Sequence, residues 1–186
     1  LDRLQERGLL MRHRSPTDGR THALALTPAG EKALARFARA MGSTTDDPFI
    51  SEPANAEQAK KARETALAEL EAFIAEHGSS DTARIAGLRA AELEVDLGNL
   101  TAADRRLEAL VAAFDPDDAR RGVALRLRGY VLDQNGDPLA AAEAYEAGAR
   151  IEAYRARVLL WIAAGDAFAR AGAPARAVGA YQQALS

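Results

Sequence analysis

Apolar and small residues recur every three to four positions between Val158 and Leu185, a spacing that places them on one side of an α-helix. The pattern stops at Gly172 and resumes after Pro174. A glycine just past a helix end can take the left-handed conformation, and a proline suits the first turn of the next helix. We therefore predict two helices joined by a tight turn. Their packing positions are Trp161, Ala164, Gly165 and Phe168 in the first helix and Ala177, Tyr181 and Ala184 in the second.

The same pattern occurs 36 residues earlier, with Gly129 in the place of Gly165 and Tyr145 in the place of Tyr181. A third copy lies 38 residues before that one. A period of this length built from helix pairs predicts an α-solenoid, in which each unit buries its apolar face against its neighbours. The third copy is marked by Ala91, Gly98, Ala103 and Leu107, and a degenerate half unit before it by Ala66, Leu70 and Phe73.

The spacing W-x2-A-G-x2-F, followed by A-x3-Y-x2-A, resembles the tetratricopeptide repeat (TPR). This resemblance implies a mainly α chain with TPR-like repeats over 57–186: a half unit at 57–78 and full units at 81–114, 116–150 and 152–186. The earliest full unit departs from the pattern, since Gly87 stands in the place of Trp161 and Glu94 in the place of Phe168. A shifted register or looser packing is expected there.

Polar residues and prolines mark the starts of the predicted helices. Ser80 precedes a helix expected over 81–97, and Thr101 with Asp104 has the spacing of a capping box for a helix over 102–114. Asp117-Asp118 and Asp137-Pro138 are typical of two further helix starts, because acidic side chains favour the positive end of a helix.

Charge is distributed unevenly along the chain. Residues 1–40 hold eight Lys and Arg against four acidic residues, a net charge of +4, although the whole chain carries -3. We call this basic N-terminal segment the front. A basic front followed by an acidic remainder of the chain favours contact between the front and a polyanion. The front is predicted to contain a β-hairpin, because apolar and polar residues alternate over 9–14 and 21–26 around Pro16-Thr17-Asp18-Gly19, and then a helix capped by Thr27.

This front, over 1–41, resembles the C-terminal half of a MarR-type winged-helix domain. The motifs that carry the resemblance are Asp2-Arg3-Leu4, Arg7-Gly8-Leu9, Asp18, Arg20 and Leu26-Thr27-Pro28-Ala29-Gly30. The resemblance implies a partial winged helix from a dimeric, DNA-binding transcription regulator, with Asp18 holding the wing and Arg20 reaching a minor groove of duplex DNA. Arg12 and Arg14 on the wing are further candidate DNA-binding residues. The alternative without a DNA-binding role is that Asp18 and Arg20 pair with each other across a turn.

Residues 42–56 read as a linker rich in Gly, Ser, Thr, Asp and Pro. Both ends of the given sequence look cut, and the sequence does not decide whether 1–41 and 57–186 belong to one natural protein. No apolar run is long enough to span a bilayer.

In a TPR array the first helix of each pair lines a concave surface that binds a protein or peptide. Carried over by position, the outward residues of these helices are Leu88, Glu92 and Asp96, then Arg126, Tyr130, Asp133 and Gln134, then Ile162, Asp166 and Arg170. Arg126, Tyr130, Gln134 and Arg170 are the candidate partner-binding residues, because a guanidinium fork, a phenol ring and an amide suit such a surface. A solvated polar face explains the same residues equally simply.

No catalytic motif stands out. The chain has no cysteine, its three histidines are isolated, and it lacks a G-x-S-x-G, a phosphate-binding glycine loop and a zinc-binding helix motif. We expect no enzyme, no metal and no cofactor. Our first hypothesis is a cytoplasmic transcription regulator whose MarR-like wing binds duplex DNA and whose TPR array binds a protein or peptide. The alternative is a TPR scaffold or assembly factor without a DNA role.

Overall fold

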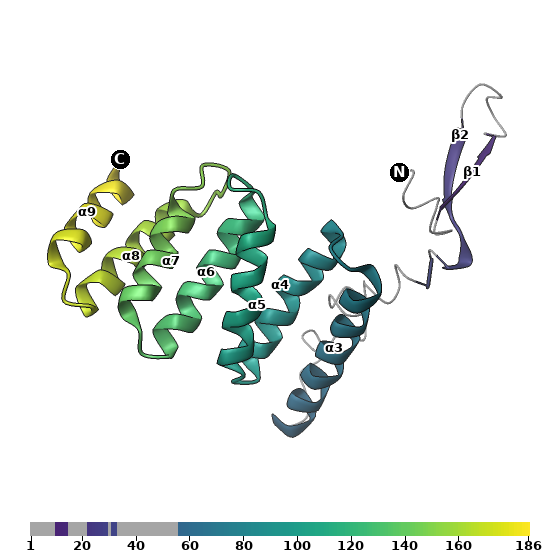
Figure 1. The fold of residues 1–186 in the computed structure, drawn as a ribbon, viewed down its shortest axis with the longest axis horizontal. Helices are drawn as coiled ribbons and strands as arrows, with labels where there is room; N and C mark the ends of the chain where they lie inside the picture. The colour runs from purple at the N-terminus through teal and green to yellow at the C-terminus, as the bar shows by residue number, and fades with distance from the viewer. Residues whose placement is uncertain (1–9, 15–21, 30, 33–55) are drawn as a thin grey trace. The chain divides into compact units, whose positions relative to one another are not determined.

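The structure is a computed structural model of the 186-residue chain, and it describes residues 10–14, 22–29, 31–32 and 56–186. The chain divides into two compact units, Leu1–Phe73 and Ile74–Ser186 (Figure 1). The boundary falls inside helix α3 (Ala56–His77), which is 22 residues long and buries Ala59, Leu70 and Phe73.

Apart from α3, the described part of the first unit holds two strands and a short helical turn. β1 (Leu10–Arg14) and β2 (His22–Leu26) pair antiparallel, with Leu10 opposite Leu26 and Arg14 opposite His22. The strand pair expected from the alternating pattern is therefore present, and the expected turn lies outside the described residues. The backbone N–H of Glu31 donates to the Thr27 carbonyl at 2.8 Å, so a helical turn follows the strands.

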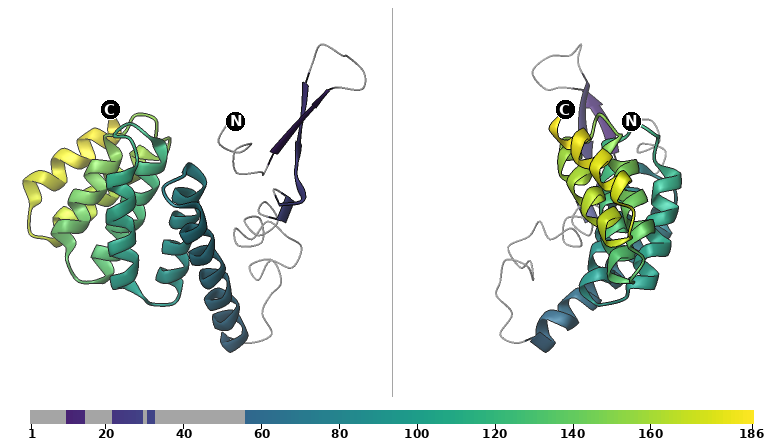
Figure 2. Two further views of the ribbon diagram at one scale, coloured as in Figure 1. Left: turned by 45° about the vertical axis from the view of Figure 1, so that its right-hand side comes forward. Right: turned by 90° about the vertical axis from the view of Figure 1, so that its left-hand side faces the viewer.

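The second unit is built from consecutive helix pairs (Figure 2). Each helix packs along the next one in the chain, and α4 also contacts α6 while α6 contacts α8. The first helices of the pairs therefore form one row and the second helices another. The pairs are α4 (Asp81–Asp96) with α5 (Leu100–Ala113), α6 (Ala119–Gln134) with α7 (Pro138–Ala149), and α8 (Arg157–Arg170) with α9 (Pro174–Leu185).

Two apolar clusters hold these pairs together. One, around Leu107, Phe114 and Val131, joins α4, α5 and α6. The other, around Leu160 and Phe168, joins α7, α8 and α9. Small residues at the helix contacts let the larger side chains of neighbouring helices fill the space, which is how the recurring alanines and glycines of the sequence produce a stack.

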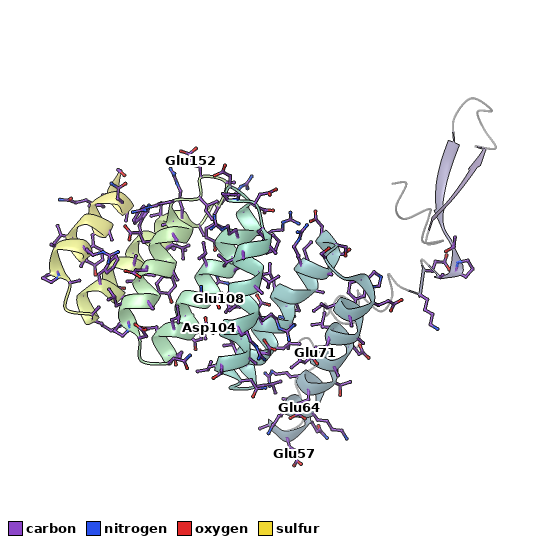
Figure 3. The ribbon with its side chains drawn as sticks, viewed as in Figure 1. Glu57, Glu64, Glu71, Asp104, Glu108 and Glu152 are labelled. Atoms are coloured by element: carbon purple, nitrogen blue, oxygen red, sulfur yellow. The ribbon has the colours of Figure 1, made fainter. Side chains whose placement is uncertain are left out.

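The caps at the helix ends are the residues that the sequence predicted, with one exception. Ser80, Asp118 and Asp137 are N-caps whose side chains accept backbone N–H groups, and Gly136 and Gly172 end helices with φ of +81° and +72°. The predicted capping box was wrong: α5 begins at Leu100 after Asn99, and Asp104 instead accepts a hydrogen bond from Nε of Arg128 at 2.8 Å. Figure 3 labels Asp104 and Glu108, the two α5 carboxylates that share the guanidinium of Arg128.

The looser packing expected around Glu94 was also wrong. Glu94 is 4% exposed, and its carboxylate accepts hydrogen bonds from Nε and Nη2 of Arg106 at 2.9 and 2.6 Å. At Gly87, a Cβ atom would lie 3.1 Å from the Leu110 side chain, so leucine fills the room that the missing aromatic leaves. An ion pair and a neighbouring leucine thus substitute for the aromatic packing of the last unit, where Trp161 and Phe168 stand at these positions.

Candidate protein-binding face of the helical repeats

The first helices of the three pairs expose equivalent positions on one side of the second unit. The repeat offsets align Leu88, Arg126 and Ile162 in one row across α4, α6 and α8. The next two turns add Glu92, Tyr130 and Asp166, then Asp96, Gln134 and Arg170. We call these nine residues the α4–α6–α8 face.

Arg126 and Tyr130 lie one helical turn apart on α6, and both are exposed, Tyr130 by 44%. Within the part of the chain that the structure describes, Arg126 forms no hydrogen bond or ion pair. Its guanidinium therefore keeps its donors available for an external acceptor.

Arg170, by contrast, is already engaged. Its Nη2 donates to Oδ1 of Asp133 at 2.8 Å, which ties α8 to α6 across the face. The pair is partly exposed, with 51% of the Arg170 side chain and 26% of the Asp133 side chain accessible, so its net contribution to stability is small. Its effect is to fix where the two charges lie.

A tyrosine from the second row of helices reaches this group. The Tyr145 ring lies against the backbone of α6 at Gly129, where a Cβ atom would come within 2.5 Å of Tyr145 Cε1. Burial, followed by the charge of Asp133, raises the pKa of the Tyr145 phenol, and the cations Arg170 and Arg126 oppose that shift. The phenol thus lies within electrostatic range of four residues of α6 and α8, the fourth being Tyr130.

The same arrangement is repeated one unit later. The Tyr181 hydroxyl donates to Oδ1 of Asp166 at 2.6 Å, and this hydrogen bond raises the pKa of the phenol. Tyr181 is 36% exposed, so it is not the core residue that the repeat pattern predicted. Its ring packs on Gly165 while its hydroxyl contacts Asp166 of the α4–α6–α8 face.

The face also carries exposed apolar side chains. Ile162 is 42% exposed and Leu159, one turn before it on α8, is 65% exposed. A guanidinium that has no partner in the described ranges, a phenol ring and exposed aliphatic groups on neighbouring helices suit the binding of a protein segment.

Three of the four partner-binding residues predicted from the sequence come together here. Arg126, Tyr130 and Arg170 all lie within electrostatic range of Tyr145. The fourth, Gln134, is exposed at the last turn of α6. Tyr145 is the residue whose part in the group was missed, whereas Asp133 was predicted to face outward but was not among the four candidates. The 36-residue repeat could have pointed to Tyr145, but a tyrosine at a packing position is more simply interpreted as core.

The predicted DNA-binding residues are placed only in part. Arg12 and Arg14 lie in β1, whereas Asp18 and Arg20 fall outside the described residues. Among the described ranges, no group of three or more His, Cys, Asp or Glu residues is arranged to hold a metal ion. In the same ranges, no helix combines the length and the apolar character needed to cross a membrane.

A family model described as a tetratricopeptide repeat-like domain matches residues 50–186. The chain belongs to this TPR-like family. The family's repeats in this chain are the helix pairs described above, with their turn glycines and their contacts between tyrosine and glycine. Residues 1–49 lie outside the match. The winged-helix interpretation of the front therefore gains no support from it.

Among solved structures, the crystal structure of MamA is similar to the chain, with a TM-score of 0.57 and 19% sequence identity. The similarity covers 87% of this chain and 95% of the MamA chain. At this identity it shows the shared fold alone. No curated protein matches the chain.

Proposed function

We propose that the chain is a protein–protein interaction scaffold that binds a segment of a partner protein on its α4–α6–α8 face. The observation that supports this most directly is the exposed Arg126, which has no hydrogen-bond or ion-pair partner among the described residues, beside exposed Tyr130 and the Asp133–Arg170 pair. Membership of the TPR-like family favours the same function. The proposal assigns the chain no catalytic activity.

The face indicates what the partner segment offers. A carboxylate satisfies the Arg126 guanidinium in a charge-assisted hydrogen bond, and aromatic or aliphatic side chains cover Tyr130 and Ile162. An acidic residue close to one or two large apolar residues is therefore the expected core of the partner segment.

Selection from a random peptide library against the immobilised chain tests this function without a known partner. The selected peptides are expected to carry the acidic and apolar combination described above. Their affinity for Arg126→Glu should fall roughly tenfold or more, because a charge-assisted bond becomes a repulsion.

Arg105→Glu is the matched control, since Arg105 is an exposed arginine of α5 in the other row of helices. It changes the net charge by the same amount and should leave peptide affinity unchanged. Equal losses in the two variants, or no selected peptide sensitive to Arg126, would count against the proposal.

Duplex DNA binding by the front is a second candidate function. Two observations favour it. β1 and β2 pair antiparallel, and β1 contains Arg12 and Arg14, whose guanidiniums are of the kind that contact phosphates. The test is the anisotropy of labelled duplex DNA titrated with the intact chain at several salt concentrations. Salt-sensitive binding that weakens in Arg20→Ala would support this role, and binding unchanged by that substitution would refute it.

A further inference from the structure

The two tyrosines that rest on glycines differ in what their hydroxyl groups contact. The Tyr181 hydroxyl donates to Oδ1 of Asp166 at 2.6 Å. Tyr145 occupies the equivalent position 36 residues earlier, but its hydroxyl forms no hydrogen bond with any residue that the structure describes. The reason lies in the sequence, because the same offset places Tyr130 where the last unit has Asp166. The preceding unit therefore lacks the acceptor that the last unit supplies from its own chain.

The Tyr145 phenol is held in place by packing, and its hydroxyl reaches the surface. The residue is 8% exposed, and a Cβ atom at Gly129 of α6 would lie 2.5 Å from Cε1 of its ring. The hydroxyl oxygen does not belong to the fully buried polar atoms of the described residues that lack a hydrogen bond, so it has solvent access. A donor that is already fixed in this way loses little conformational entropy when it binds an external acceptor.

The charges around this hydroxyl favour an anionic acceptor. The guanidiniums of Arg126 and Arg170 lie within electrostatic range of the phenol, and so does the carboxylate of Asp133. Arg170 and Asp133 bind each other at 2.8 Å, so their charges largely cancel. Arg126 has no such partner in the described part of the chain, which leaves the group with one uncompensated positive charge. An anion that reaches the Tyr145 hydroxyl therefore also gains attraction from Arg126.

We propose that the Tyr145 hydroxyl donates, beside the Arg126 guanidinium, to the carboxylate of an acidic side chain in the partner segment. This carboxylate takes the part that Asp166 plays for Tyr181 in the last unit. The amide of asparagine or glutamine offers a single uncharged acceptor oxygen, so it is the weaker ligand. Tyr145 is thereby a specificity-determining residue. The inference rests on the proposed function, because it concerns the acidic residue of the same partner segment.

Tyrosine NMR tests this donor with acetate, the simplest carboxylate that suits the purpose. The chain has four tyrosines, so labelling with ¹³C at the ζ carbon gives four signals, and Tyr145→Phe identifies the signal of Tyr145. Acetate that replaces chloride at constant ionic strength should shift this signal in a saturable manner, and acetamide should bind roughly tenfold more weakly or not at all. The Tyr181 signal should stay in place, because Asp166 already accepts its hydrogen bond.

Arg126→Met and its control Arg105→Met show whether the two donors act together. Arg126→Met should weaken the acetate response of Tyr145 roughly fivefold or more, and Arg105→Met in α5 should leave it unchanged. A Tyr145 signal that acetate does not move, equal shifts with acetate and acetamide, or equal losses in the two variants would overturn the inference. Acetate stands in for the partner, so these outcomes are independent of whether any peptide is selected against the chain.

Peptide affinities then link the hydroxyl to the partner segment. Tyr145→Phe removes the hydroxyl and keeps the ring against Gly129, so the helical circular dichroism should not change. For a peptide selected as described above, exchange of its acidic residue for the amide should cost roughly tenfold in affinity with the parent chain and clearly less with Tyr145→Phe. Amidation of the peptide C-terminus should have the same effect on both proteins.

The two proposals fail in different ways in this experiment. Equal discrimination between acid and amide by the parent chain and by Tyr145→Phe would refute the role of the hydroxyl, while the sensitivity of the peptides to Arg126→Glu would still support the proposed function. A loss on C-terminal amidation that depends on the Tyr145 hydroxyl would assign the site to a chain terminus and would overturn the assignment to a side chain.

Discussion

Tyr181 lies so close to Gly165 that a Cβ atom at the glycine would be 2.4 Å from Cε1 of the ring. Tyr145 stands in the same relation to Gly129, 36 residues earlier, at 2.5 Å. Each tyrosine of a second helix thus rests on a glycine of the first helix and directs its hydroxyl toward the α4–α6–α8 face. One contact therefore serves both the stacking of the helices and the composition of the face.

Gly129→Ala is expected to destabilise the chain by about 1–2 kcal/mol, because the added methyl group must displace the buried Tyr145 ring. The free-energy cost of this displacement exceeds the gain in helix propensity. Gly165→Ala should cost less, since Tyr181 is 36% exposed and can move outward whereas Tyr145 is 8% exposed. Chemical denaturation followed by circular dichroism measures both changes.

Gly179→Ala is the control for these substitutions. It lies inside α9 in open space, so alanine should stabilise the chain by up to about 1 kcal/mol through helix propensity alone. A loss at Gly179 as large as that at Gly129 would show that the tyrosine contact is not the cause.

The Glu94–Arg106 pair predicts a strong interaction between two substitutions. Arg106→Leu alone should cost about 3 kcal/mol, because it leaves the carboxylate of the 4%-exposed Glu94 without its two donors. Adding Glu94→Leu should recover most of that loss, since the equivalent positions of the later units hold Leu132 and Phe168. Additive losses in a double-mutant cycle of unfolding free energies would contradict this reading of the pair.

Acid should weaken the chain in part through Asp118. Hydrogen bonds from the Arg120 side chain hold the pKa of this N-cap carboxyl below its ordinary value of about 3.9. The resulting stabilisation is fully present above the ordinary value and is lost as pH falls through the lower pKa of the folded state.

The corresponding experiment measures unfolding free energy between about pH 6 and pH 2 for the parent chain, Asp118→Asn and Asp117→Asn. The amide introduced by Asp118→Asn would keep the cap acceptor but lose the ion pair, so this variant should show a shallower decline below about pH 4. Asp117→Asn removes an exposed neighbouring charge and should follow the parent curve. Identical curves for all three proteins would exclude the Asp118–Arg120 pair as a source of acid sensitivity.

The helix pairs could be predicted from the sequence because the stacking contacts are local and periodic. Gly136 and Gly172 mark turns, and alanines at spacings of three and four mark the packed sides, so the α-solenoid follows from positions close together in the chain. The placement of Arg126 and Tyr130 on a common exposed face followed from the same periodicity.

Side-chain contacts between successive repeats could not be predicted from this periodicity. The Arg170–Asp133 bond joins residues 37 positions apart, and the repeat pattern marks both simply as outward-facing. Trp161 was predicted as core, and it packs, partly buried, against the last apolar cluster. Thr101 and Asp104 had capping-box spacing, but Arg128 from the next helix pair competes for the carboxylate.

The central claim is that a partner segment lies on the α4–α6–α8 face. The most direct measurement places a photo-crosslinking amino acid at Tyr130 in one variant and at Arg105 of α5 in another, and irradiates each with a peptide selected against the parent chain. A crosslinked product is expected at Tyr130, and none above background at Arg105. Equal crosslinking at the two positions, or crosslinking at Arg105 alone, would contradict it.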